Sequence, residues 1–184
     1  MLKKILVIIG CGFVAVLCFM YFSRTALYNY NVEADHAYDF ADKQAAITSL
    51  ILEGGSLQLP QHEPGNKSSF LKISVSSALA GNIYRPFVEV SDGLSTELAY
   101  FEHGAVGVRY LNISKFIEKG AAKLSLTGNN ISVANGAVEL IQFENIELDG
   151  KRVLVLAPHP DDAEIAAYGL YSEHDDVYVV TVTS

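Results

Sequence analysis

A histidine and two adjacent carboxylates directly follow an apolar run near the end of the chain. The run Val153–Leu156 leads into Ala157-Pro158-His159-Pro160-Asp161-Asp162-Ala163-Glu164. A neutral imidazole and a carboxylate are good ligands for Zn²⁺. Because His159 and Asp162 are three residues apart, one loop that enters a helix can turn both side chains toward one ion. Asp161 lies between them and can point to the open position of the ion, where it would act as general base on a metal-bound water.

The segments around this motif predict a βαβ unit. Val153–Leu156 has no polar alternation, which is typical of a strand buried on both faces of a sheet. A helical segment is expected over Ile165–Tyr171, with Asp161 or Asp162 as its N-cap. A second apolar run, Val177–Thr183, predicts a parallel strand. The polar cluster therefore lies at the carboxyl end of a strand, where open α/β sheets bind their ligands.

The motif resembles the mark of the PIG-L/LmbE-like zinc-dependent de-N-acetylases, which is His-Pro-Asp-Asp-Glu after the first strand of a Rossmann-like domain. The fifth position differs, because this chain has Ala163 there and the acid is shifted to Glu164. The His-Pro-Asp-Asp-Ala-Glu-Ile form is similar to a variant found in some members, including bacillithiol-pathway deacetylases. The resemblance covers about residues 151–184.

The resemblance implies an α/β fold, a zinc cofactor and a set of roles for the motif residues. It implies that His159 and Asp162 bind Zn²⁺ and that Asp161 is the catalytic base. It also implies hydrolysis of the N-acetyl group of an N-acetylglucosamine-type amino sugar in a glycan, glycolipid or glycoside. The alternative is a proline-stiffened loop whose aspartates only cap a helix.

A third zinc ligand is missing from the motif. Catalytic zinc sites have three protein ligands plus water, and the resemblance implies that the third is a histidine far downstream. We therefore expect the chain to be the N-terminal part of a longer enzyme and to be inactive alone. His174 lies twelve residues after Asp162, roughly 18 Å along a helix, which is too far for the same ion. The sequence places none of the other histidines near the motif: His36, His62 and His103.

An uncharged apolar run of 18 residues, Ile5–Phe22, stands near the N-terminus. As a helix it would span about 27 Å, close to the hydrocarbon thickness of a bilayer. Lys3 and Lys4 precede it, which favours a single-pass signal anchor over residues 1–24. In that orientation the N-terminus is cytoplasmic and the bulk of the chain is extracytoplasmic. A cleaved signal peptide or, through Cys11, a lipoprotein signal are the alternatives.

Charge and cysteine content exclude some classes of partner and bond. The net charge is −8, and all 21 acidic residues follow the apolar run. Nucleic-acid binding needs clustered lysine and arginine, so no nucleic-acid partner is expected. Both cysteines lie inside the run, so the rest of the chain has no disulfide.

The middle of the chain predicts a stem over residues 25–44 and an all-β domain of sandwich or jelly-roll type over 45–147. Leu71, Ile73 and Val75 alternate with polar residues, as in a half-buried strand. Asp92-Gly93 and Asn135-Gly136 predict two-residue hairpin turns. The segment 45–52 is apolar and fits a helix or a strand. Further strands are expected at Tyr84–Val90, Glu97–Glu102, Val108–Ile113, Lys123–Thr127, Ile131–Ala134 and Val138–Phe143.

The all-β domain also supports a second function class, a membrane-tethered carbohydrate-binding module without catalytic activity. Tyr84, Tyr100 and Tyr110 are candidates for stacking on sugar rings, and core packing is the alternative for each of them. An additional histidine downstream of the chain would favour the enzyme over the module.

Overall fold

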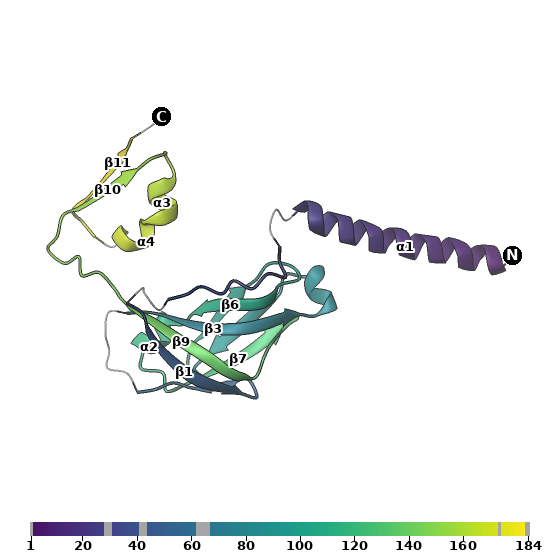
Figure 1. The fold of residues 1–184 in the computed structure, drawn as a ribbon, viewed down its shortest axis with the longest axis horizontal. Helices are drawn as coiled ribbons and strands as arrows, with labels where there is room; N and C mark the ends of the chain where they lie inside the picture. Colours follow the sequence, from purple (N-terminus) through teal and green to yellow (C-terminus); the bar gives the residue numbers. More distant parts are fainter. Residues whose placement is uncertain (1, 28–30, 41–43, 62–66, 173, 183–184) are drawn as a thin grey trace. The chain divides into compact units, whose positions relative to one another are not determined.

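The computed structural model describes residues 2–27, 31–40, 44–61, 67–172 and 174–182 (Figure 1). The fold is mostly β, with eleven strands in the described residues and an apolar helix at the N-terminus. The chain divides into two compact units, Met1–Glu144 and Asn145–Ser184.

Helix α1 (Leu2–Leu27) contains the predicted apolar run. Its segment Lys3–Met20 has a mean hydropathy of 2.2, and none of it is buried. The helix is therefore long and apolar enough to cross a membrane, as the sequence predicts, although a signal sequence would have the same properties.

Nine strands of the first unit form one antiparallel sheet in the order β5-β4-β7-β2-β1-β9-β3-β6, with β8 paired to β3. Two short helices, η1 (Leu79–Asn82) and α2 (Ser114–Glu118), connect strands. The strands are β1 (Ala46–Glu53), β2 (Ser56–Gln58), β3 (Lys67–Ser77), β4 (Phe87–Ser91), β5 (Thr96–Tyr100), β6 (Val106–Asn112), β7 (Lys123–Asn129), β8 (Ile131–Val133) and β9 (Gly136–Glu144).

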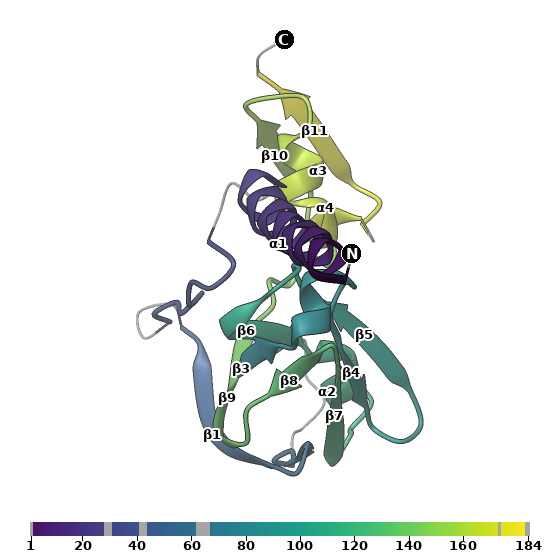
Figure 2. The same cartoon turned by 90° about the vertical axis from the view of Figure 1, so that its right-hand side faces the viewer.

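The core of this unit is enclosed by the sheet itself. The alternation in β3 is confirmed, because Leu71, Ile73 and Val75 are all buried. Val88 of β4 belongs to the same buried cluster, although four strands separate β4 from β3 in the sheet order. The sheet must therefore curl over so that its two halves face each other (Figure 2). A sandwich usually consists of two separate sheets, whereas here one continuous hydrogen-bonded sheet forms both layers.

The two predicted turns differ from the structure. β4 and β5 do form a hairpin, but its loop has four residues, between Ser91 and Thr96. The Asn135-Gly136 prediction is wrong: β8 pairs with β3, and β9 pairs with β1 and β3. The ambiguous segment 45–52 is resolved as strand β1.

The predicted stem is not a free linker over residues 31–40. Val32 is buried, and its carbonyl accepts a hydrogen bond from the Val106 amide at 3.1 Å. The Val108 amide donates to the Asp35 carboxylate at 2.9 Å. Buried Arg109 donates to the carbonyls of Val32 and Ala34 at 2.9 and 3.1 Å and forms an ion pair with Glu102. These bonds hold the segment along the edge of β6.

The second unit is a βαβ unit, as the sequence predicts. Strands β10 (Val153–Ala157) and β11 (Val177–Thr181) are parallel, and the short helices α3 (Asp162–Ala166) and α4 (Tyr168–Tyr171) lie between them in sequence. The prediction that β10 is buried on both faces is wrong, because Leu154 and Leu156 are 60% and 64% exposed. The physical reason is that β10 pairs only with β11 in the described chain, and one face of this two-stranded sheet stays open.

Candidate functional site

The His-Pro-Asp-Asp motif lies where β10 ends and α3 begins. Ala157 closes the strand and is buried, and its carbonyl accepts a hydrogen bond from the Val182 amide at 2.9 Å. Asp161 occupies the N-cap position of α3. Ala163 is buried in the first turn, whereas Glu164 is exposed. The helix therefore turns the shifted acid toward solvent.

The side chains of His159 and Asp162 are in direct contact. Asp162 Oδ2 lies 3.0 Å from His159 Nδ1 and accepts the His159 backbone N–H at 2.9 Å. Zinc bonds to imidazole nitrogen and carboxylate oxygen are about 2.0–2.2 Å long, so two atoms at this separation can bind one ion together. The imidazole side chain is 70% exposed and the carboxylate 38%. Asp162 Oδ2 therefore holds the two side chains together, and both are exposed enough for an ion to reach them.

Asp161 is next to this pair but makes no capping hydrogen bond to the helix. Its backbone carbonyl accepts the Ile165 amide at 3.0 Å, while its exposed carboxylate extends from the start of the helix. Asp161 therefore lacks the side-chain bond expected of a residue that only caps α3.

The described residues bring two candidate zinc ligands, His159 and Asp162, together at this site. Within them, no group of three or more histidine, cysteine, aspartate or glutamate side chains is placed to hold a metal ion. His174 follows α4, where its amide donates to the Tyr171 carbonyl at 3.0 Å. His36 and His103 belong to the first unit, and His62 lies outside the described residues. His159 and Asp162 thus fit part of a zinc site by their donor atoms and their contact.

A second candidate site is a hollow of about 440 Å³ on the outer face of β3, β6 and β9, which we call the aromatic hollow. Phe40 lies at its centre, with its ring 5.8 Å from Tyr110 and 5.5 Å from Phe143, both edge-on. The Tyr38 amide donates to the Tyr110 hydroxyl at 3.0 Å. The lining residues are Tyr38, Phe40, Phe70, Tyr110, Ile141 and Phe143.

An ion pair lies on the same face, beside the aromatic hollow. Lys72 Nζ is 2.7 Å from Glu139 Oε2, and Lys72 is the cross-strand neighbour of Tyr110. The hydrogen bond to Glu139 raises the pKa of the Lys72 ammonium, so Lys72 remains charged at neutral pH. The hollow therefore offers stacking surfaces with hydrogen-bonding groups at its rim.

Of the three tyrosines suggested by the sequence, only Tyr110 lines this hollow. Tyr100 instead packs against Phe87 with ring centroids 5.4 Å apart, and the Arg85 guanidinium lies 5.3 Å from its centroid. Tyr84 is exposed. The sequence analysis did not identify Tyr38 and Phe40. They are two residues apart, and this spacing is typical of an extended segment with one side against a surface.

Comparisons with known proteins assign no family to the chain. No protein-family model matches it, and no curated protein matches it. The likeness to PIG-L/LmbE-like enzymes therefore rests on the motif residues and on their position after β10.

Proposed function

We propose that the protein is a membrane-anchored, zinc-dependent deacetylase that acts on an N-acetylglucosamine-type amino sugar in a glycan, glycolipid or glycoside. The observation that supports this proposal most directly is the His159–Asp162 contact of 3.0 Å at the carboxyl end of β10. That edge of an α/β sheet is where ligands bind, and imidazole with carboxylate is a donor set that zinc prefers.

The motif residues would have separate roles in amide hydrolysis. His159 and Asp162 would hold zinc together with a histidine from outside the described residues. Zinc would supply Lewis-acid polarisation of the amide carbonyl and a lower pKa for the attacking water. Asp161 would take a proton from that water and return it to the leaving nitrogen. Water adds to the acyl carbon, the C–N bond breaks, and the products are the free amine and acetate.

The surroundings of the motif support a Rossmann-like domain. β10 and β11 are parallel, and parallel sheets are normally covered on both faces. The exposed side chains of Leu154 and Leu156 are the apolar surface that further strands and helices of such a domain would cover.

The N-terminal helix supports the membrane assignment. α1 carries an 18-residue apolar span that begins at Lys3. Lys3 and Lys4 at its start favour a cytoplasmic N-terminus. The catalytic unit would then act outside the cytoplasm, on a substrate at or beyond the membrane surface.

The proposal is tested by acetate release from N-acetylglucosamine glycosides and glycolipids by the natural protein in its source membrane. We expect a chelator to abolish release and added Zn²⁺ to restore it. Release that continues unchanged in the chelator, or no release from any N-acetylated sugar, would contradict the proposal.

A second candidate function, glycan binding by the first unit, is favoured by the aromatic hollow. Aromatic rings can stack on the apolar face of a sugar, while Lys72 and Glu139 can bond its hydroxyls. We expect Tyr110→Ala to weaken binding on a glycan array at least tenfold and Tyr100→Ala, outside the hollow, to leave it unchanged. Equal effects of both substitutions would count against this site.

A further inference from the structure

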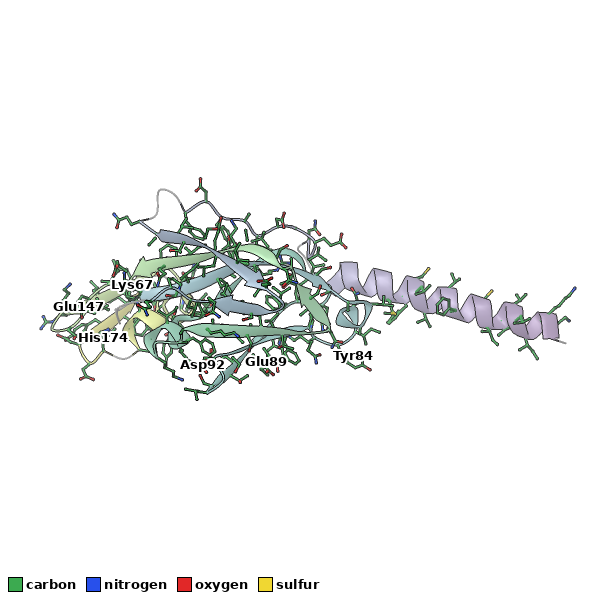
Figure 3. The ribbon with its side chains drawn as sticks, turned by 90° about the horizontal axis from the view of Figure 1, so that it is seen from below. Lys67, Tyr84, Glu89, Asp92, Glu147 and His174 are labelled. Carbon is green, nitrogen blue, oxygen red and sulfur yellow. The ribbon has the colours of Figure 1, made fainter. Side chains whose placement is uncertain are left out.

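The segment between β3 and β4 presents large apolar side chains to solvent. Leu79 is 83% exposed, Ile83 57% and Tyr84 66%, and Tyr84 lies at the periphery of the molecule (Figure 3). We call residues 79–85 the 79–85 loop. Three such residues in a six-residue stretch are more than the isolated exposed apolar residues normal on a protein surface.

The backbone of the 79–85 loop is fixed against the sheet. Gly81 is buried, and a Cβ added there would lie 2.5 Å from the carbonyl oxygen of Asn130. The Ala78 amide donates to that same carbonyl at 3.0 Å. The backbone of the loop is therefore packed against the sheet, and its large apolar side chains are exposed to solvent.

The 79–85 loop is close to the point where α1 joins the sheet. Gly81 accepts a hydrogen bond from the Gly104 amide at 3.1 Å, and Val106, two residues later, donates to Val32 at 3.1 Å. Only five residue-to-residue steps separate Leu27, the end of α1, from buried Val32. Fully extended, they reach about 18 Å. Helix residues 21–27 add roughly 10 Å beyond the apolar span. The apolar span therefore ends within about 28 Å of Val32, which is bonded at this end of the sheet.

The residue types at this end match a membrane interface. Leucine and isoleucine enter the acyl boundary, and tyrosine prefers the headgroup level. Arg85 stacks on Tyr100 at the same end, and a long cationic side chain there can reach lipid phosphate. The opposite end of the β4–β5 hairpin differs, because its exposed Leu94 sits in a turn built on the Asp92 carboxylate.

We propose that the 79–85 loop inserts Leu79, Ile83 and Tyr84 into the lipid interface beside the anchor, and so fixes the orientation of the first unit on the membrane. The proposal rests on the part of the proposed function in which α1 spans the bilayer. A single helix leaves a domain free to rotate and tilt, whereas a second contact beside it restricts both.

The test uses the full chain in vesicles of phosphatidylcholine and phosphatidylglycerol that carry a nitroxide quencher near the headgroup. Single cysteines labelled with an environment-sensitive fluorophore are placed at position 79 or 83 after the natural Cys11 and Cys18 are replaced by alanine. The matched control is Leu94→Cys, since Leu94 is also an exposed leucine in a loop. A separate variant that keeps only Cys18 reports on the anchor.

We expect several-fold stronger quenching for Leu79→Cys and Ile83→Cys than for Leu94→Cys. Strong quenching at Cys18 with equally weak quenching at positions 79, 83 and 94 would overturn the loop proposal and leave the anchor intact. No quenching at Cys18 would overturn the anchor itself. Circular dichroism that matches the parent chain would show that each labelled variant is folded.

Discussion

Asp162 bonds both the backbone and the ring of His159 through one oxygen, and this arrangement sets what the motif can do. The backbone bond of 2.9 Å holds the carboxylate, and the carboxylate orients the imidazole at 3.0 Å. An oriented ring binds a metal ion with less loss of side-chain freedom than a free one. Zinc affinity must therefore depend on Asp162, both as a proposed ligand and as the group that orients His159.

At this scale we predict that Asp162→Ala lowers the zinc affinity of the natural protein at least 10-fold, the lower end of the effect of losing such a partner. Competition with a zinc-sensitive dye measures the affinity. Glu164→Ala is the control, because it removes an exposed acid two residues away. An unchanged affinity in Asp162→Ala would show that zinc does not bind at this motif.

One charged side chain stabilises the β4–β5 hairpin, and another stabilises the edge of β6. They are Asp92 and Arg109. In the hairpin, Asp92 Oδ1 accepts the amides of Ser95 and Leu94 at 2.6 and 2.8 Å. At the β6 edge, Arg109 joins Glu102 to the backbone of residues 32–34. Asp92 is partly exposed and Arg109 is buried, so a substitution at each is expected to have a different effect.

For the hairpin we predict a pH-dependent effect. The Ser95 and Leu94 amides lower the pKa of the Asp92 carboxyl below its ordinary value of 3.8. Its charge therefore adds stability above about pH 4, and this contribution is lost as pH falls through the lowered folded-state pKa. Thermal unfolding should show Asp92→Asn less stable than the parent at pH 7, with the difference shrinking toward zero below pH 4. Leu94→Ala, which changes no charge on the same hairpin, should show no such trend.

For the β6 edge we predict that Arg109→Met destabilises the first unit by about 3 kcal/mol, because it leaves Glu102 without its buried partner. Hydrogen exchange should become faster at the Val106 amide, which donates to Val32. Lys115→Met, which removes an exposed ion pair with Glu97, should change little. Unchanged protection at Val106 in Arg109→Met would mean that Arg109 does not hold the 31–40 segment.

The sequence predicts the elements with strong local patterns and misses those that depend on distant partners. The alternation in β3 and the parallel pair of β10 and β11 could be predicted because each pattern lies within one segment. Strand β2 has only three residues, and its pairing with β1 and β7 gives no local signal. The Asn135-Gly136 turn was predicted wrongly because dipeptide preference says nothing about which strands pair.

The two candidate sites show the same contrast. His159 and Asp162 are three residues apart, so a loop-to-helix turn brings them together and the sequence predicts the pair. The aromatic hollow draws its residues from the 38–40 segment and three strands. Only the tertiary fold places Phe40 beside Tyr110 and Phe143, so composition alone could suggest Tyr110 but not its neighbours.

For the whole molecule, the deacetylase proposal requires three parts with separate tasks. The helix α1 is long and apolar enough to cross a membrane. Val32, five positions after the end of that helix, is already buried in the first unit. The second unit carries the His-Pro-Asp-Asp motif. This combination predicts a membrane-tethered enzyme, and its net charge of −8 does not favour nucleic acid as a partner.

The measurement that tests the deacetylase proposal most directly compares Asp161→Asn with Glu164→Gln in the natural membrane protein, by zinc content and by acetate release. We predict that Asp161→Asn retains its zinc and loses at least 100-fold in turnover, the typical contribution of a general base. Glu164→Gln should retain both. Full acetate release by Asp161→Asn would contradict the assigned catalytic role.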